Sequence, residues 1–308
     1  MGGSAALKLP AALRPGDLVA IAAPGSPFDR AAFTRGAEFI ADLGYRVSWR
    51  ADITARAGYL AGDDERRATE LNSWLRDPEA KAILFARGGY GTSRIVDRLD
   101  FAALRRHPKA IAGFSDLTAL LLASTRRAGV AAFHAPMVAA AGKDRRGERD
   151  LAHLLALLAG APGPRAHRGL RALRPGRARA VVTGGNLSLL AHSIGTPFQL
   201  AARGRILFVE ETGEAPYRID RMVRQLLLAG VFRDVAGLVL GQFSGLKPAA
   251  RRAVAGLFLE ALGERAVPVV EGFAAGHESP NRAFPLGVAA TLDADAGTLV
   301  FDPCVQAP

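Results

Sequence analysis

The chain has 308 residues, of which 49% are apolar, and a formal net charge of +11. This length suits two domains with a sizeable core, and the composition excludes an intrinsically disordered chain. No apolar run reaches the roughly 18–20 residues that a transmembrane helix needs, and the N-terminal stretch has no charged start followed by an apolar segment. The single cysteine, Cys304, has no partner for an internal disulfide or a metal site. We therefore expect a cytoplasmic globular protein that does not bind a membrane.

The positive charge comes almost entirely from arginine, because only five of the 40 basic residues are lysine. Proteins that bind nucleic acid gather their basic residues on one face or tail. Here the arginines are spread along the chain, and the densest group lies in a proline- and glycine-rich stretch at 165–179. This pattern argues against nucleic acid as a partner.

The first half of the chain alternates predicted strands with predicted helices. Apolar runs bounded by turn residues predict strands at 17–23, 45–52, 81–86, 109–114 and 129–137. Helical patterns occur at 30–43, within 58–80, at 92–104 and from 116 onward. Such alternation predicts an α/β fold with crossover connections and a mostly parallel sheet. Ligands of these sheets bind at the carboxyl ends of strands, where PGSP (24–27), RGGYG (87–91) and FSD (114–116) all fall.

A change in composition predicts the domain boundary. Residues 161–179 are rich in proline, glycine and arginine, and we expect a linker there between domains of residues 1–160 and 180–308. The second domain begins with a strand, a Gly-Gly-Asn turn and a helix. Further strands are predicted at 205–211, 236–243 and 267–273, with a helix at 248–262. A polar loop then precedes two short strands, which are joined through 295–297 as a terminal hairpin.

Ser115 is the first candidate for chemistry. It lies in KAIAGFSDLTALLLAS (109–124), which predicts a buried strand, an abrupt turn and an apolar helix. A serine on such a turn is lifted out of the sheet, and the backbone N–H of Asp116 then faces whatever the hydroxyl attacks. Gly113 precedes the serine by two positions as in a nucleophile elbow, but Leu117 stands where that pattern has a second glycine. This stretch alone favours a helix cap at Ser115 or Asp116 over a nucleophile.

A nucleophilic serine needs a base and an acid. Among the six histidines, His277 in the polar loop and His134 at a strand end have the placement of a base, and His277 fits better. Glu210 and Glu211 follow the apolar run ILFV, so their carboxylates are expected at the ligand-binding end of a strand. A strand that simply turns polar at its end is the alternative. No clustered His/Cys spacing appears, so we expect no metal and no cofactor.

Two glycine-rich loops, RGGYG (87–91) and TGGNL (183–187), match neither a dinucleotide fingerprint nor a P-loop. Both allow backbone N–H groups to approach a ligand closely. One amide from RGGYG together with the Asp116 N–H would make an oxyanion hole. Tight strand-to-helix turns, which need glycine in any case, are the alternative interpretation.

Taken together, six stretches resemble the LD-carboxypeptidase family of serine peptidases, which includes murein tetrapeptide carboxypeptidases and microcin C self-immunity proteins. In chain order they are GYLAGDDERRATELN, ILFARGGYGTSRIVDRLD, IAGFSDLTALL, VVTGGNLSLLAHSIGTP, LFVEETGEAPYRIDRMVRQL and GHESPNRAFPLG. The resemblance covers residues 13–301. It implies a Rossmann-like N-terminal domain, a smaller swivelling α/β C-terminal domain and a homodimer.

The resemblance also implies roles for individual residues. It makes Ser115 the nucleophile, Glu210 the triad acid and His277 the base, with Glu211 at a position where an aspartate is common. The oxyanion hole would use backbone amides of Asp116 and of Gly88 and Gly89. Acid and base would then come from the second domain, so the arrangement of the domains would set activity.

The expected reaction is metal-free cleavage of an L,D-peptide bond, which releases a C-terminal D-alanine from a murein tetrapeptide recycled in the cytoplasm. The free carboxylate of the substrate needs a cation, for which Arg87 and Arg282 are candidates. One alternative is a self-immunity hydrolase that cleaves an aminoacyl-nucleotide antibiotic. Another is a non-catalytic ligand-binding protein on the same scaffold.

Overall fold

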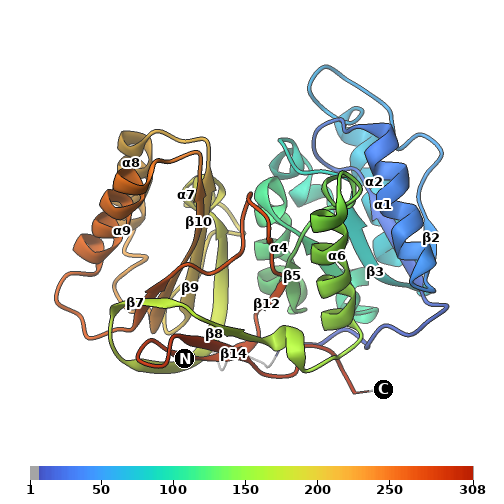
Figure 1. Cartoon of the computed structure of the whole chain (residues 1–308). Helices are drawn as coiled ribbons and strands as arrows, with labels where there is room; N and C mark the ends of the chain where they lie inside the picture. Colours follow the sequence, from blue (N-terminus) through green and yellow to red (C-terminus); the bar gives the residue numbers. More distant parts are fainter. Residues whose placement is uncertain (1–6, 308) are drawn as a thin grey trace. The chain divides into compact units, whose positions relative to one another are not determined.

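Figure 1 shows the computed structural model of the chain, which describes residues 7–307. These residues form two compact units. Unit 1 comprises residues 7–164, 282–287 and 303–307, and unit 2 comprises residues 165–281 and 288–302. The chain therefore passes between the units four times, and two short pieces of the C-terminal region belong to unit 1.

Unit 1 is built on a six-stranded sheet in the order β12-β5-β4-β3-β1-β2. Its strand pairs are parallel except β12 with β5, so the predicted mostly parallel sheet is confirmed. The strands are β1 (Leu18–Ala22), β2 (Arg46–Ser48), β3 (Ala80–Phe85), β4 (Ala110–Gly113), β5 (Ala132–His134) and β12 (Phe284–Leu286). The helices are α1 (Arg30–Asp42), α2 (Asp64–Arg76), α3 (Phe101–Arg106), α4 (Thr118–Ala123), α5 (Val138–Ala141) and α6 (Arg145–Leu158).

The sequence explains these elements locally. The central strands β1, β3 and β4 are apolar runs that are buried almost throughout, as expected for parallel strands covered on both faces. Four of the helices of unit 1 begin at an aspartate whose carboxylate accepts a hydrogen bond from a backbone N–H of the first turn. These caps are Asp29, Asp63, Asp100 and Asp144.

Unit 2 contains an eight-stranded mixed sheet in the order β6-β14-β13-β8-β9-β10-β11-β7. Its strands are β6 (Ala166–Arg168), β7 (Arg171–Arg174), β8 (Arg177–Asn186), β9 (Ile206–Thr212), β10 (Gly237–Ser244), β11 (Val269–Glu271), β13 (Ala289–Asp293) and β14 (Thr298–Phe301). The helices are α7 (Leu187–His192), α8 (Pro216–Leu228) and α9 (Pro248–Leu262). Strands β8 to β11 are parallel, and the predicted terminal hairpin is confirmed as the antiparallel pair β13–β14.

The segment at 161–179, which the sequence predicts to be a linker, contains β6, β7 and the start of β8. Strand β6 pairs with β14 and β7 pairs with β11, so both are edge strands with partners more than 90 residues away in the chain. Strands this short have no local signature, because what orders them is pairing with distant segments. The change of unit falls between residues 164 and 165, inside this segment.

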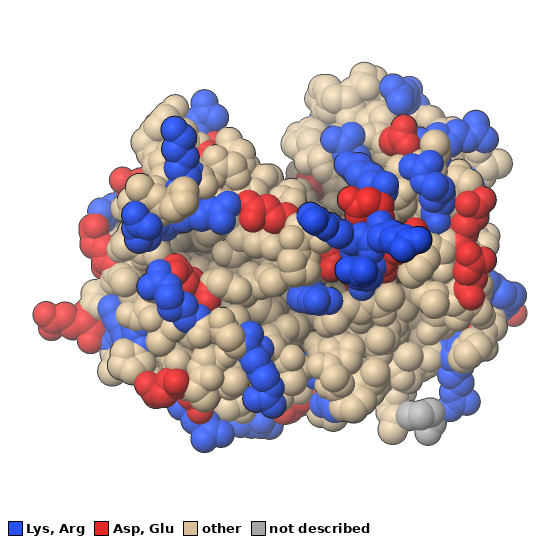
Figure 2. Space-filling model, viewed as in Figure 1, with Lys and Arg blue, Asp and Glu red and all other residues tan. Residues whose placement is uncertain are grey.

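Charged side chains are interspersed over the face seen in Figure 2, where acidic residues accompany many of the basic ones. Several arginines are paired with carboxylates in this way, such as Arg179 with Asp302 at 2.7 Å. None of the helices among residues 7–307 combines the length and the apolar character that crossing a bilayer requires. Cys304 is buried and is not part of a disulfide.

Candidate active site

Ser115 lies on the turn between β4 and α4, at the carboxyl end of β4. With a φ of 61°, it is the one residue other than glycine with a positive φ among residues 7–307. This backbone conformation costs a side-chain-bearing residue roughly 1–2 kcal/mol, and it is typical of a serine displayed on a sharp strand-to-helix turn. Gly113 is needed two positions earlier, because a Cβ there would come within 2.8 Å of the Phe85 ring. The strand-to-helix turn that the sequence predicts is confirmed.

The RGGYG loop after β3 lies against this turn. A Cβ on Gly88 would lie 3.3 Å from the Ser115 Cβ and 3.5 Å from the Asp116 backbone nitrogen. The Gly88 carbonyl accepts a 2.8 Å hydrogen bond from the backbone N–H of Ser26, in the PGSP loop. The three loops predicted at the carboxyl ends of strands therefore meet in unit 1. Their geometry suits backbone amides that converge on an oxygen beside Ser115, which stays a prediction for Asp116, Gly88 and Gly89.

The side chain of Asp116 holds two of these loops together. Its carboxylate is 1% exposed and accepts hydrogen bonds from the Thr92 N–H at 2.8 Å and the Thr92 hydroxyl at 2.6 Å. Burial raises the pKa of the Asp116 carboxyl, and the two bonds from Thr92 oppose that effect. Thr92 directly follows the RGGYG loop, so the residue after the serine fixes the loop that lies against the serine. The sequence analysis used only the backbone N–H of Asp116 and missed this role of its carboxylate.

Arg67 links the PGSP loop to the RGGYG loop. Its side chain is fully buried, and its guanidinium donates to the carbonyl oxygens of Pro24 and Gly91, the latter at 2.9 Å. It also pairs with Asp64 on its own helix. Arg67 lies on the same face of α2 as Leu71 and Leu75, which are both buried. An arginine on the apolar face of a helix was therefore a signal that the sequence offered and that the sequence analysis missed.

In unit 2, Glu210 and His277 form a hydrogen-bonded pair. The His277 Nδ1 and the Glu210 Oε2 are 2.8 Å apart, and the Glu210 side chain is fully buried near the end of β9. Burial raises the pKa of Glu210, and the hydrogen bond from His277 opposes the shift. Because Nδ1 faces the carboxylate, it carries the proton in the neutral imidazole, and Nε2 is then the basic nitrogen. Sequence reasoning singled out both residues, and the structure brings them together.

The loop that carries His277 is held by two amide side chains of unit 2. Gln242 on β10 accepts a 2.7 Å bond from the Glu278 N–H and donates a 2.9 Å bond to the Pro280 carbonyl. Asn281 accepts from the Gly276 N–H at 3.1 Å. The histidine therefore lies on a loop that is clamped on both sides of it. Gln242 was also missed, because nothing in the sequence marks a single glutamine on a strand.

Glu211 has a structural role that differs from that of its neighbour. Its carboxylate accepts from the Asn186 amide at 3.0 Å and from the N–H and hydroxyl of Ser188 at 2.8 and 2.6 Å. These bonds fix the Gly-Gly-Asn turn and the first turn of α7. Of the two adjacent glutamates, only Glu210 is paired with a histidine.

The remaining candidates lie in different surroundings. His134 is fully buried in β5, and its ring stacks on Phe284 with centroids 5.0 Å apart, as expected of a core residue. Arg87 donates a 2.7 Å bond to the Pro27 carbonyl beside the glycine loop. Arg282 lies close enough to His153 on α6 to contribute, after burial, to lowering the pKa of that imidazole to about 4. Among residues 7–307, no three His, Cys, Asp or Glu side chains are grouped as metal ligands would be.

Both halves of the chain are similar to known proteins. Residues 19–135 match the LD-carboxypeptidase N-terminal domain, and residues 179–292 match the LD-carboxypeptidase C-terminal domain. The chain is 37% identical to a probable murein peptide carboxypeptidase of Bacillus subtilis, over 96% of this chain and 95% of the relative. It is 27% identical to the microcin C7 self-immunity protein MccF of Escherichia coli, over 93% of both chains.

A solved structure supports the same relationship. The crystal structure of a muramoyltetrapeptide carboxypeptidase from Oxalobacter formigenes is 28% identical to this chain, with a TM-score of 0.79 over 94% of this chain and 100% of that one. Both halves of the chain thus match one family, and both the turn that bears Ser115 and the strand that bears Glu210 lie within the matched residues. The chain belongs to the LD-carboxypeptidase family.

Proposed function

We propose that this protein is a serine carboxypeptidase that cleaves the last peptide bond of a murein tetrapeptide and releases D-alanine. The observation that carries the proposal is the 2.8 Å hydrogen bond between His277 Nδ1 and Glu210 Oε2. It gives the imidazole the orientation of a general base in a chain of the LD-carboxypeptidase family. The substrate class is supported by the relatives named murein peptide carboxypeptidase and muramoyltetrapeptide carboxypeptidase.

In the proposed mechanism, the Ser115 Oγ attacks the carbonyl carbon of the bond that precedes the terminal D-residue. His277 Nε2 takes the hydroxyl proton, and the Glu210 carboxylate stabilises the imidazolium that forms. The same proton passes to the amine of the departing D-alanine, which leaves an ester on Ser115. A water molecule then attacks this ester, again with His277 as the base, and the shortened peptide leaves with a free carboxylate.

The negative charge on the carbonyl oxygen is the largest electrostatic demand of this reaction. We assign its stabilisation to the backbone N–H groups of Asp116 and of the Gly88–Gly89 stretch. The support for this is the close approach of Gly88 to Ser115 and to the Asp116 nitrogen, 3.3 and 3.5 Å from a Cβ built on the glycine. The bonds from Thr92 to the Asp116 carboxylate fix the RGGYG loop relative to the turn that bears Ser115.

A carboxypeptidase also has to bind the free carboxylate of its substrate. Of the two arginines considered, Arg87 directly precedes Gly88, whereas Arg282 lies near His153 on α6. We assign carboxylate binding to Arg87. Substitution of Arg87 by alanine is expected to raise KM, with Arg282→Ala as the matched comparison. A larger effect of Arg282→Ala on KM would reverse the assignment.

The central test is Ser115→Ala. We expect kcat on a murein tetrapeptide to fall by roughly 10³-fold or more, while the unfolding transition is retained. Reaction with a serine-directed phosphonate should label Ser115 in the wild-type protein and not in the variant. Turnover by Ser115→Ala near the wild-type rate would remove the triad from consideration. A wild-type protein that binds the peptide but neither cleaves it nor reacts with the phosphonate would instead be a ligand-binding protein.

The similarity to MccF supports a second candidate substrate, an aminoacyl-nucleotide. The two chains are 27% identical over 93% of each, and the same catalytic groups would cleave an aminoacyl-nucleotide. Turnover on a murein tetrapeptide and on an aminoacyl sulfamoyl adenosine, measured side by side, separates the two functions. We expect kcat/KM to be higher for the peptide.

The proposal also includes a homodimer that works in the cytoplasm. Sedimentation analysis of the purified protein tests the dimer.

A further inference from the structure

Two tyrosines of unit 1 stand together on its surface. The side chains of Tyr59 and Tyr90 are 64% and 47% exposed, and their ring centroids are 5.7 Å apart with an interplanar angle of 56°. They come from different loops, one between β2 and α2 and the other the RGGYG loop. Single exposed aromatic residues are common and need no explanation. A pair that two separate loops bring together is a feature that marks a binding site.

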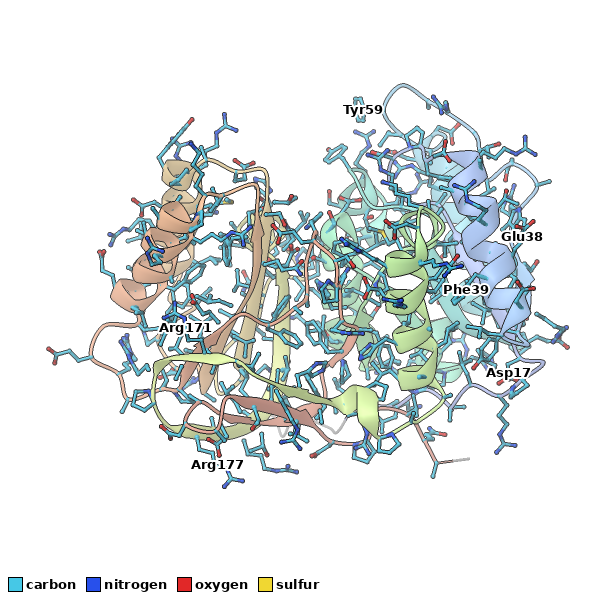
Figure 3. The ribbon with its side chains drawn as sticks, in the orientation of Figure 1. Asp17, Glu38, Phe39, Tyr59, Arg171 and Arg177 are labelled. Atoms are coloured by element: carbon cyan, nitrogen blue, oxygen red, sulfur yellow. The ribbon has the colours of Figure 1, made fainter. Side chains whose placement is uncertain are left out.

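Hydrogen bonds fix the backbone around both tyrosines. Tyr59 lies at the tip of a tight hairpin closed by two bonds between Ala57 and Leu60, at 2.9 and 3.1 Å. The hairpin is attached to the PGSP loop, because Ala61 N–H donates to the Gly25 carbonyl at 2.9 Å. Tyr90 is attached to the same loop, since its N–H donates to the Ser26 hydroxyl at 3.1 Å. Figure 3 shows the Tyr59 ring projecting at the outer end of this part of unit 1.

Arg94, which is paired with Asp64, lies near the two tyrosines. Arg94 donates to both carboxylate oxygens of Asp64, at 3.0 and 2.8 Å. The pKa of Arg94 is raised, first by these bonds to Asp64 and then by the nearby Tyr90 and Tyr59 hydroxyls. The pair therefore presents two apolar ring faces next to a set of hydrogen-bonding groups, which is the combination that recognises a ring with apolar C–H faces and polar edges.

The backbone of Tyr90 lies within the reach of the proposed substrate. Gly88 lies against Ser115, and Tyr90 follows it by two residues, so the Tyr90 backbone is within about 12 Å of the serine. A carboxypeptidase that removes the fourth residue of a peptide leaves three residues on the other side of the cleaved bond. Extended, these span about 10 Å, and the link to a sugar adds to this length. The group attached to the amino end of the peptide can therefore reach the tyrosines.

We infer that the Tyr59–Tyr90 pair binds the sugar attached to the amino end of the peptide, a muramoyl pyranose ring. The inference rests on the proposed function, since the peptide sets the distance. A sugar fits better than a nucleobase, because rings inclined at 56° leave no flat slot for a planar base. The weakly positive C–H groups of a pyranose pack on the negative faces of tyrosine rings, while its hydroxyls meet Arg94 and the tyrosine hydroxyls.

The test compares a muramoyl-tetrapeptide with the same tetrapeptide lacking the sugar. We expect kcat/KM of the wild-type protein to be about tenfold higher for the sugar-linked substrate, equivalent to about 1.4 kcal/mol. Tyr59→Ala should lose most of this preference, and Tyr59→Phe, which keeps the ring, should retain it. Tyr217, exposed on α8 in unit 2, provides the matched control: Tyr217→Ala should leave the preference as in the wild type.

Dissociation constants measured in the Ser115→Ala background give the same comparison without turnover. A tenfold tighter Kd for the sugar-linked peptide that disappears with Tyr59→Ala supports the inference even if no substrate is cleaved, in which case only the proposed function fails. Equal binding of both peptides, or an equal loss for both in Tyr59→Ala, overturns the inference. A Tyr59-dependent gain for an aminoacyl sulfamoyl adenosine, without one for the sugar, would assign the pair to a nucleobase and overturn it as well.

Discussion

At the scale of single residues, the backbone of Ser115 makes a prediction independent of catalysis. A positive φ penalises any residue with a Cβ, whereas glycine adopts it freely. Ser115→Gly should therefore be more stable than Ser115→Ala by about 1 kcal/mol, although both lose the hydroxyl. Urea unfolding of the two variants measures the difference. Equal unfolding free energies would mean that the turn relaxes in the variants and stores no strain.

The candidate site shows which residues a sequence can reveal. Ser115, Glu210 and His277 stand at turns and strand ends, where local pattern and motif resemblance both apply, and Glu210 and His277 are found hydrogen-bonded to each other. Asp116, Arg67 and Gln242 act through partners between 24 and 43 residues away in the chain. Long-range hydrogen bonds leave no periodicity in the sequence, so their geometry could only come from the structure.

At the scale of the element, Gln242 on β10 is expected to position the histidine loop. Gln242→Leu removes both bonds to the loop around His277, and misplacing a catalytic base by about 1 Å lowers turnover strongly, so we expect kcat to fall tenfold or more. Gln225 on α8 bonds to the Ala191 carbonyl at 3.1 Å and provides a matched control in the same unit. If Gln242→Leu and Gln225→Leu change kcat equally, the loop does not depend on this clamp.

Lys109, which directly precedes β4, is a buried cation at the C-terminal end of α2 and has a pH-dependent effect. Lys109 is 1% exposed and donates to the Trp74 and Asp77 carbonyls, and burial lowers its pKa from 10.5 to about 8. Between these values the unfolded chain binds more protons, so this residue makes the free energy of unfolding increase as the pH rises from 8 toward 10.5. Lys109→Met should remove that increase.

Urea unfolding at pH 7.5 and 9.5 checks this expectation. The difference in unfolding free energy between the two pH values should be larger for the wild-type protein than for Lys109→Met. Lys143, which is exposed, gives the comparison for removal of a lysine charge alone. Equal pH dependence in the wild type and in Lys109→Met would show that the lysine stays as accessible to protons in the folded protein as in the unfolded chain.

Elements differed in how well the sequence predicted them. The helix at 248–262 coincides with α9, since apolar periodicity and a proline near its start mark it locally. Residues 92–104 were predicted as one helix and instead form two short 3₁₀ turns before α3. Strands β6 and β7 were taken as linker, because three or four residues that pair only with β14 and β11 have no pattern of their own.

At the scale of the whole molecule, the chain passes between the two units four times. This path predicts how fragments of the chain behave. Residues 1–164 expressed alone lack β12, which pairs with β5 and places Phe284 on His134. We expect this fragment to be less soluble than the same fragment with residues 282–287 attached through a flexible linker, because an unpaired apolar edge strand promotes association. Soluble yield and size-exclusion profiles measure the difference. Identical behaviour of the two fragments would show that β12 is dispensable for unit 1.

The late position of β12 also has a consequence for biosynthesis. Phe284 follows its partner His134 by 150 residues, so the ribosome completes the other five strands of unit 1 long before their edge is covered. At elongation speeds of about 5–20 residues per second, the apolar edge of β5 waits roughly 8 to 30 s for its neighbour. During that interval the nascent chain offers a binding surface to chaperones, and rare codons between 134 and 284 would prolong it.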